Sequence, residues 1–175
     1  MRRDRGGLPP LHLQLAGPAA RPSGFPDHAF VLPALAVGEY PTPEDAGWLR
    51  AAQRFTAVVS LQDDEDLRRK GLHAGALGRA FDAAGLDWLR HPAEDGNPES
   101  LRGALDAAVA SVHRHVASGG RVYLHCNAGL NRAPTVAIAY LHVHRGLDLD
   151  AARDRVKAVR ACVPYMRVLE AHFGA

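Results

Sequence analysis

The residues best suited to chemistry are Cys126 and Arg132, with five residues including Gly129 between them. The segment 121–125, which follows two glycines, predicts a buried strand before the cysteine, and residues 133–145 predict a helix after the arginine. In such a strand–loop–helix turn, the loop N–H groups and the helix N-terminus point at one small volume, which favours an anion. Arg132 can offer a planar fork of donors to two phosphate oxygens. The segment therefore predicts a phosphate cradle.

The same donors favour the thiolate of Cys126 over the thiol, so this cysteine should be nucleophilic near neutral pH. The loop N–H groups and Arg132 would then both bind the phosphate and activate the nucleophile. The alternative is a buried, inert cysteine beside a loop arginine. The neighbouring His125, the spacing to Arg132 and the strand–loop–helix context together favour the nucleophile.

The segment 125–132, His-Cys-Asn-Ala-Gly-Leu-Asn-Arg, resembles the HCxxGxxR motif of the protein tyrosine phosphatase superfamily, and in particular its dual-specificity branch. The resemblance extends over roughly residues 30–173. It implies a phosphatase that hydrolyses phosphate monoesters through a phosphocysteine at Cys126, with His125 ordering the loop and with no metal or cofactor. It also implies that the phosphate is held by a run of loop residues: Asn127, Ala128, Gly129, Leu130, Asn131 and Arg132.

In this family an aspartate upstream of the cysteine, on a mobile loop, protonates the leaving oxygen and later activates water. Asp95 lies 31 residues before Cys126 and just after a predicted strand, so the resemblance implies that it is the general acid. Glu94 is the rival, and a solvated turn before a helix is the alternative for either carboxylate. Leu101, six positions after Asp95, matches the family pattern and favours Asp95.

One position departs from the family pattern. Most members carry Ser or Thr directly after the arginine, where the hydroxyl stabilises the cysteine as leaving group in the second step, but here that position is Ala133. We expect the departure to slow hydrolysis of the phosphoenzyme. Thr135 is two residues too far along the chain to be assumed a substitute.

The resemblance implies a phosphorylated protein as substrate, with a phosphoglucan as the alternative. The Cys-Asn-Ala-Gly at 126–129 resembles that of glucan phosphatases, but those enzymes follow their acid with an aromatic residue, where this chain has Gly96. Leu130 and Asn131 place no lysine in the loop, which counts against a phosphoinositide. Two further classes stay open: a rhodanese-like sulfurtransferase, whose loop is usually one residue shorter, and a non-catalytic phosphate-binding module.

These residues need a scaffold, and strand patterns alternate with helix patterns along the chain. Strands are predicted at 30–37 (one strand or a pair), 55–61, 86–90 and 121–125. Helices are predicted after Thr42, around 75–84, from Pro98 after an Asn97 cap, at 133–145, at 149–161, and from Pro164 to about Phe173. This order implies an α/β fold, with a central, mostly parallel four- to five-stranded sheet flanked by helices on both faces.

An acidic run, Asp63-Asp64-Glu65-Asp66, directly follows the predicted strand at 55–61. Functional loops of open α/β sheets lie at this edge. A solvated loop is nevertheless the preferred interpretation of the run.

Composition favours one globular domain without a nucleic-acid or membrane partner, which we expect to be a monomer. Of 175 residues 47% are hydrophobic, and the 21 Lys plus Arg against 19 Asp plus Glu form no basic stripe. Two cysteines are too few for a secreted disulfide scaffold, which indicates a reducing, cytoplasmic environment, with Cys162 as a core thiol. The histidine pairs at 113/115 and 142/144 would not share a helix face, so no metal site is predicted.

Prolines and glycines crowd residues 1–28, which we interpret as a flexible leader. The arginines at its start precede an apolar segment too broken for a secretory signal. Residues 29–175 are then assigned to the phosphatase domain.

Overall fold

A computed structural model describes residues 24–174. Its centre is a five-stranded sheet in the order β1-β2-β5-β3-β4, in which β1 runs antiparallel to β2 and all other neighbours are parallel. The strands are β1 (His28–Leu32), β2 (Leu35–Gly38), β3 (Ala57–Ser60), β4 (Asp87–Arg90) and β5 (Val122–His125). The predicted, mostly parallel sheet is confirmed, and the segment 30–37 belongs to a pair of strands.

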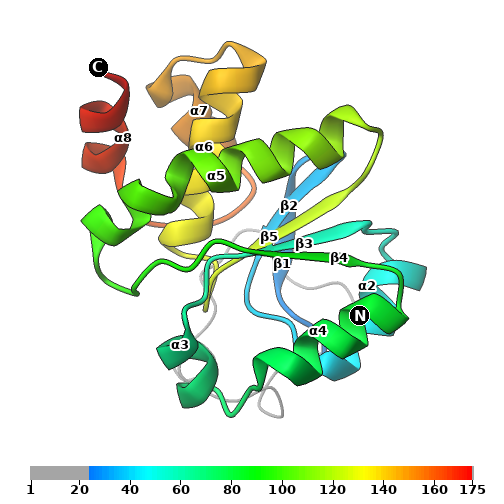
Figure 1. Cartoon of the computed structure of the whole chain (residues 1–175). Helices are drawn as coiled ribbons and strands as arrows, with labels where there is room; N and C mark the ends of the chain where they lie inside the picture. The colour runs from blue at the N-terminus through cyan, green and yellow to red at the C-terminus, as the bar shows by residue number, and fades with distance from the viewer. Residues whose placement is uncertain (1–23, 175) are drawn as a thin grey trace.

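Helices cover both faces of this sheet, as predicted. They are η2 (Pro43–Asp45), α2 (Ala46–Ala51), α3 (Asp64–Arg69), α4 (Ala74–Ala83), α5 (Pro98–Ala117), α6 (Arg132–Arg145), α7 (Leu149–Lys157) and α8 (Met166–Phe173). In Figure 1, α5, α6, α7 and α8 lie above the sheet, and α2, α3 and α4 lie below it. The segment that joins β5 to α6 therefore passes from the sheet into the upper helical layer.

Two hydrophobic clusters, one on each face of the sheet, hold the layers together. Successive residues of β5 alternate between them, as the two-residue period of a strand requires. Leu124 belongs to the cluster that contains Leu105 of α5 and Ile138 of α6. Tyr123 belongs to the other, with Phe81 of α4. All four residues of β5 are buried, so the strand that leads into the predicted cradle is fixed from both sides.

Caps define the helices that flank the predicted site. Asn97 caps α5 by accepting a hydrogen bond from the N–H of Ser100 at 3.2 Å, and Pro98 follows it at the first helical position. Gly146 ends α6 in the left-handed conformation, with φ at 69°. The predicted cap and both helices are confirmed.

The acidic run at 63–66 is a correction to the sequence interpretation. It is not a solvated loop, because Asp63 accepts a hydrogen bond from the N–H of Asp66 at 2.8 Å and caps the short helix α3. Acidic residues in the first turn and arginines in the last turn favour this helix. Two helix ends also differ from the prediction, since α7 stops before residue 161 and α8 begins after Pro164.

Most of the predicted leader, residues 1–23, lies outside the described residues. Of the remainder, Asp27 forms an ion pair with the buried Arg160 at 3.0 Å, and β1 already begins at His28. The division of the chain at residue 28 stays a prediction.

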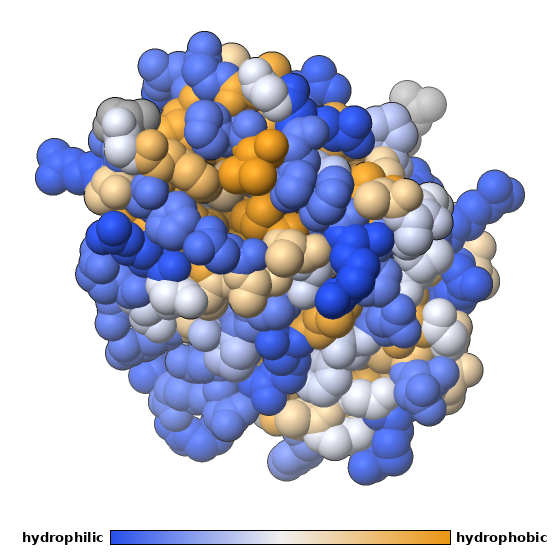
Figure 2. All heavy atoms as spheres, turned by 45° about the horizontal axis from the view of Figure 1, so that its top comes forward, coloured by the Kyte–Doolittle hydropathy of each residue, from blue (hydrophilic) through white to orange (hydrophobic). Residues whose placement is uncertain are grey.

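Charged residues cover much of the face seen in Figure 2, with hydrophobic residues gathered between them in its upper half. Three large hydrophobic side chains of the described residues are exposed: Phe25, Val143 and Val163. Within residues 24–174, no helix combines the length and the apolar character needed to span a membrane.

Candidate active site

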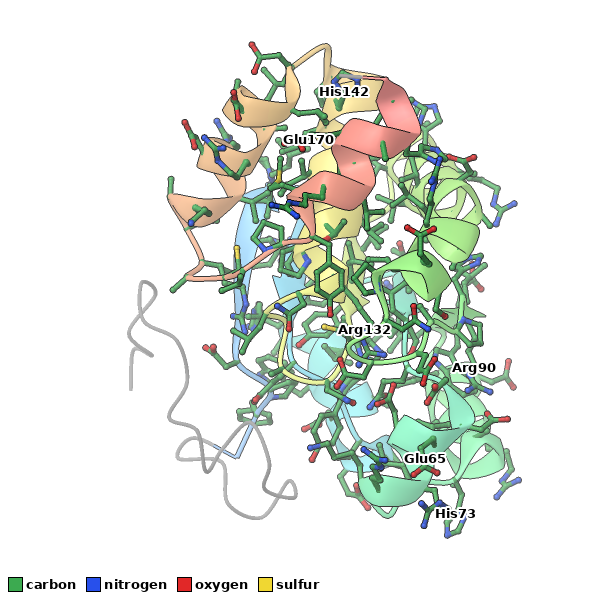
Figure 3. The ribbon with its side chains drawn as sticks, turned by 90° about the vertical axis from the view of Figure 1, so that its left-hand side faces the viewer. Glu65, His73, Arg90, Arg132, His142 and Glu170 are labelled. Carbon is green, nitrogen blue, oxygen red and sulfur yellow. The ribbon has the colours of Figure 1, made fainter. Side chains whose placement is uncertain are left out.

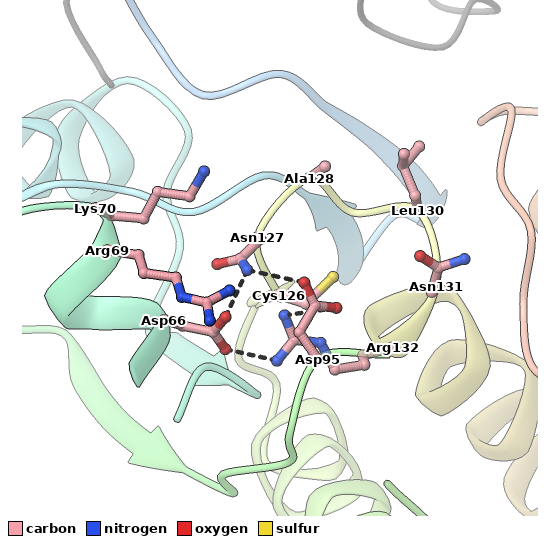
Figure 4. A pocket seen from close by; sticks show the side chains of 10 residues that line it. All are labelled: Asp66, Arg69, Lys70, Asp95, Cys126, Asn127, Ala128, Leu130, Asn131 and Arg132. Carbon is pink, nitrogen blue, oxygen red and sulfur yellow. Dashed lines mark hydrogen bonds and ion pairs between the residues drawn. The ribbon is translucent and has the colours of Figure 1, made fainter. Parts of the chain in front are cut away.

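A cavity of about 290 Å³ opens beyond the carboxyl ends of β3 and β5, the edge at which parallel α/β sheets bind ligands (Figure 4). Three parts of the chain line it: helix α3 with its C-terminal cap, the segment after β4, and the loop between β5 and α6. The lining residues are Asp66, Arg69, Lys70, Asp95, Cys126, Asn127, Ala128, Leu130, Asn131 and Arg132. The fold thus brings the predicted Cys126, Arg132 and Asp95 to one cavity.

The loop between β5 and α6 leaves its N–H groups available to a ligand. Every carbonyl oxygen from residue 125 to residue 131 accepts a hydrogen bond. The donors are, in order, N of Leu61, Nδ1 of His125, N of Tyr40, Nη2 of Arg160, Nε of Arg160, N of Val163 and N of Thr135. Among the described residues, by contrast, no acceptor is bound by the N–H groups of 127–131. Unpaired N–H groups beside a cavity form an anion-binding nest.

Gly129 is required in this loop by its backbone conformation and by a close approach. Its φ is 67°, a region that side chains disfavour, and an added Cβ would lie 2.7 Å from the backbone of Gly38 and 2.9 Å from Nη2 of Arg160. Arg160 is 4% exposed and binds the carbonyls of residues 128 and 129 at 2.7 and 2.8 Å. It therefore fixes the turn from outside the cavity, a role that the sequence analysis did not assign.

Arg132 lies near the centre of the molecule, where Figure 3 labels it, and is 1% exposed. Its Nη1 donates to the carboxylate of Asp66 at 2.7 Å and to the carbonyls of Ala93 and Leu61 at 2.7 and 3.3 Å. Nε and Nη2 are buried without a hydrogen-bond acceptor among the described residues. One edge of the guanidinium is thus anchored, and the other can receive two oxygens of a tetrahedral anion.

Burial alone would lower the pKa of Arg132, but the negative charges that Cys126 and Asp66 can carry outweigh it and raise the pKa. The guanidinium therefore stays charged throughout the working pH range.

Asp66 is the residue that the sequence analysis missed. Its side chain is 5% exposed, and its two oxygens bind Nη1 of Arg132 at 2.7 Å and Nδ2 of Asn127 at 2.6 Å. Burial would raise the pKa of Asp66, but the hydrogen bond and charge of Arg132, with the Asn127 amide, lower it below the usual value. Asp66 is ionised at neutral pH and orients both the arginine and the first residue of the nest.

Asp95 and Glu94, the two candidates for the acid, lie differently. Oδ1 of Asp95 is 3.2 Å from Nη2 of Arg132, and its side chain is 52% exposed at the cavity. Glu94 does not line the cavity, and its carboxylate instead accepts a hydrogen bond from the side chain of Asn97 at 2.8 Å.

Tyr165 also belongs to the surroundings of Asp95. Burial, together with the charge of Asp95, raises the pKa of this tyrosine. A neutral phenol therefore packs beside the segment that carries Asp95.

The remaining predicted loop residues support the turn in different ways. Nδ1 of His125 lies 2.9 Å from the carbonyl oxygen of Cys126, a contact of the kind predicted for it. The amide of Asn127 binds Gln62 at 2.8 Å and reaches Asp95 at 3.3 Å. Nδ2 of Asn131 donates to the carbonyl of residue 163 at 2.6 Å, which ties the loop to the segment before α8.

Ala133, which lacks the hydroxyl, is fully buried in the first turn of α6, and the hydroxyl of Thr135 one turn along has other partners. The hydroxyl of Thr135 donates to the carbonyl of Asn131 at 2.7 Å and accepts from the N–H of Tyr165 at 2.8 Å. Because both bonds are structural, Thr135 does not serve as the substitute.

Neither a metal site nor a disulfide is found within the described residues. No group of three or more His, Cys, Asp or Glu could hold a metal ion there. Cys126 and Cys162 are both free and buried. Burial raises the pKa of Cys162, so it is a thiol at neutral pH.

This fold, with a cysteine at the head of an anion nest and a half-anchored arginine at its end, defines the class of cysteine-based phosphatases, which hydrolyse phosphate monoesters. Comparison with known proteins agrees. The family model described as "Dual specificity phosphatase, catalytic domain" matches residues 46–170, most of the chain. The chain belongs to the dual specificity phosphatase family.

Curated relatives come from two groups. The amyloplastic phosphoglucan phosphatase DSP4 of Castanea sativa is 31% identical over 149 residues, which are 82% of this chain and 39% of the relative. Dual specificity protein phosphatase 26 of Bos taurus is 31% identical over 86 residues, 49% of this chain and 41% of the relative. The chain thus spans less than half the length of these relatives.

Among solved structures, the active form of Tk-PTP superposes with a TM-score of 0.68 at 26% identity, and the match covers 83% of this chain and 95% of that one. The likeness extends across almost the whole of that structure. It agrees with the phosphatase fold described above.

Proposed function

We propose that the protein is a dual-specificity protein phosphatase that dephosphorylates phosphorylated proteins through a phosphocysteine at Cys126. The observation that supports this most is the division of Arg132 into two edges. Nη1 is anchored on Asp66, whereas Nε and Nη2 make no hydrogen bond among the described residues, and Nη2 has only the ion pair with Asp95 at 3.2 Å. Together with the unused N–H groups of 127–131, that edge matches the oxygens of a phosphoryl group.

In the first step, the Cys126 thiolate attacks phosphorus from one side while the bond to the leaving oxygen breaks on the other. The nest and Arg132 hold the three remaining oxygens, where charge is spread in the transition state. Asp95, whose carboxyl group borders the same cavity, gives its proton to the leaving oxygen as the alcohol departs. The product is a phosphocysteine and a carboxylate at position 95.

In the second step, the Asp95 carboxylate takes a proton from water as the water oxygen attacks phosphorus. The phosphorus–sulfur bond breaks, inorganic phosphate leaves, and the Cys126 thiolate is restored. A hydroxyl at position 133 would stabilise that departing thiolate, and Ala133 supplies none. We propose that this second step limits the rate.

A phosphoglucan is the second candidate substrate, and it is favoured by the Castanea sativa relative, a phosphoglucan phosphatase 31% identical over 149 residues. Among residues 24–174, no aromatic residue lines the cavity to stack on a sugar ring, so we place the phosphoglucan second. Parallel phosphate-release assays on a phosphotyrosyl peptide, a phosphoseryl peptide and a phosphorylated glucan separate the two candidates.

The mechanism is tested with p-nitrophenyl phosphate and full-length variants. Cys126→Ser should abolish turnover with the fold intact by circular dichroism, and substantial residual activity would refute the phosphocysteine. Asp95→Asn should lose about 10²–10⁴-fold in kcat on a phosphopeptide, as for a missing acid, and Glu94→Gln much less. Thiosulfate turnover would instead indicate a sulfurtransferase, and phosphate binding without turnover a non-catalytic module.

We also propose that the protein acts as a monomer in a reducing compartment such as the cytoplasm. All groups used in the mechanism belong to one chain, and the reaction needs Cys126 as a free thiol. Light scattering of the purified protein tests the first point. Fractionation of cells that express the full-length chain tests the second.

A further inference from the structure

We propose that Arg69 and Lys70 form a second anion subsite at the mouth of the cavity, which selects phosphopeptides with an acidic group beside the phosphorylated residue. This inference rests on the proposed phosphatase function and specifies its substrate. Both residues line the cavity that Cys126 and Arg132 line. In Figure 4 they extend from the end of α3, on the side of the cavity opposite Leu130 and Asn131.

The carboxylates of α3 leave a surplus of positive charge at this end of the helix. Asp64 pairs with Arg90 at 2.8 Å, and Asp66 pairs with Arg132 at 2.7 Å. Only Glu65 remains among the acidic residues of α3. Its Oε1 serves two guanidinium groups, those of Arg68 and Arg69, at 2.5 and 2.7 Å. The helix end therefore presents more positive than negative charge.

Lys70 adds a further positive charge at the C-cap of α3. Its Nζ lies 5.3 Å from the centroid of the Tyr40 ring, a cation–π contact that keeps the ammonium group at the cavity. A cation held at the rim of a pocket attracts a second negative group on the same ligand.

The opposite rim has the contrary character. The N–H of Val163 donates to the carbonyl of Leu130 at 2.8 Å, so the two residues adjoin, and the Val163 side chain is 63% exposed. Neither carries a charge. A bound substrate therefore meets a cationic side at α3 and a neutral, apolar side at the loop.

This asymmetry favours a peptide over a glucan. A glucose unit next to the phosphorylated one offers hydroxyls and a face for stacking, and it gains little from two cations. The aromatic ring of Trp48 is stacked on Phe25, with centroids 4.5 Å apart, and does not line the cavity. A glutamate, an aspartate or a second phosphorylated residue in a peptide matches the subsite directly.

The test measures peptide binding to the full-length Cys126→Ser variant by fluorescence anisotropy, so that it does not depend on turnover. Three peptides of equal length carry one phosphotyrosine, flanked by glutamates, by phosphothreonine or by glutamines. At low salt we expect the glutamate and phosphothreonine peptides to bind about two- to tenfold more tightly than the glutamine peptide, the range for one or two exposed ion pairs. The ratio should shrink at high salt.

Charge-removal variants locate the effect. In the Cys126→Ser background, Arg69→Gln with Lys70→Gln should bring the ratio towards one. Arg68→Gln is the matched control, because it removes a neighbouring charge of α3 that does not line the cavity, and it should keep the ratio.

Preference for the phosphothreonine peptide alone would identify the second anion as a phosphate. Equal binding of all three peptides, an equal loss in Arg68→Gln, or tighter binding of a soluble phosphoglucan would overturn the subsite. Absence of p-nitrophenyl phosphate turnover by the wild type would instead refute the proposed function and leave the binding result standing.

Discussion

Replacing Asp66 by Asn tests whether the buried carboxylate positions the arginine of the cradle. The change keeps the shape of the side chain and removes the charge that pairs with Nη1 of Arg132 at 2.7 Å. The two side chains are 5% and 1% exposed, so solvent cannot replace the lost partner. Removing one partner of a buried pair costs about 3–5 kcal/mol. Since the amide oxygen of Asn can still accept a hydrogen bond, we expect the lower end of that range.

A loss of about 3 kcal/mol lowers Tm by roughly 6–12 °C in a domain of this size. Activity should fall as well, because Nη1 loses its charged partner and keeps neutral acceptors such as the carbonyls of Ala93 and Leu61. A catalytic group displaced by about 1 Å loses on the order of 10²-fold in rate. The loss should appear in kcat for p-nitrophenyl phosphate, a substrate too small to need the surroundings of the cavity.

The pH dependence separates charge from shape. The folded-state pKa of Asp66 is lowered, so its stabilising effect is complete above its unfolded-state pKa, about 3.9, and is lost as the pH falls below it. The stability difference between the wild type and Asp66→Asn in urea unfolding should therefore be full at pH 7 and shrink progressively as the pH falls below about 4.

Asp64→Asn is the matched control, since it neutralises a carboxylate of the same helix that is 90% exposed and paired with Arg90. We expect a change of about 0–1 kcal/mol and no loss of kcat. The positioning role of Asp66 is refuted if Asp66→Asn keeps kcat within a few-fold of the wild type, or if the two variants behave alike.

Three further predictions concern the loop and the second thiol. Ala133→Ser should raise the steady-state rate and diminish a pre-steady-state burst of p-nitrophenol in stopped-flow traces; an unchanged burst would mean that the missing hydroxyl does not limit turnover. Gly129→Ala should unfold at a lower temperature and lose vanadate inhibition, because its Cβ would meet backbone atoms at 2.7 Å; wild-type inhibition would contradict the close approach. At pH 7 iodoacetamide should modify Cys126 and spare Cys162, whose pKa burial raises, as peptide mass spectrometry would show; equal labelling would contradict this.

Much of the fold could be predicted because the local sequence patterns agree with how each segment packs in the folded protein. The segment 121–125 is predicted to be a buried strand, and β5, with all four residues buried, is that strand. Caps at Asn97 and Gly146 act within one turn of helix, so their chemistry is visible in sequence. A helix end without a capping residue is difficult to predict from sequence, and the predicted end of α7 at residue 161 was wrong because the helix ends at Lys157.

The residues of the candidate site also differ in how far they could be predicted from local sequence. Cys126 and Arg132 lie within one local turn, and their spacing suffices to predict a cradle. Asp66 and Arg160 act through contacts 66 and 31 residues away in sequence, to Arg132 and Gly129 respectively, and no local pattern marks such contacts. The acidic run at 63–66 did carry a signal, because Asp63 and Asp66 fit an N-cap and its N3 position. The interpretation of the run as a solvated loop was wrong because the buried Arg132 needs a carboxylate partner, and Asp66 is that partner.

The arrangement around Arg132 also explains why a lysine could not replace it. One edge of the guanidinium has a structural role: Nη1 joins α3, the segment after β3 and the segment after β4 through Asp66, Leu61 and Ala93. The other edge, Nε and Nη2, makes no hydrogen bond among the described residues and can bind a ligand. An ammonium group has its three donors on one atom, so it cannot hold a structural partner on one edge and a ligand on the other. Because Asp95 lies 3.2 Å from Nη2, an incoming phosphoryl oxygen and the acid compete for that donor.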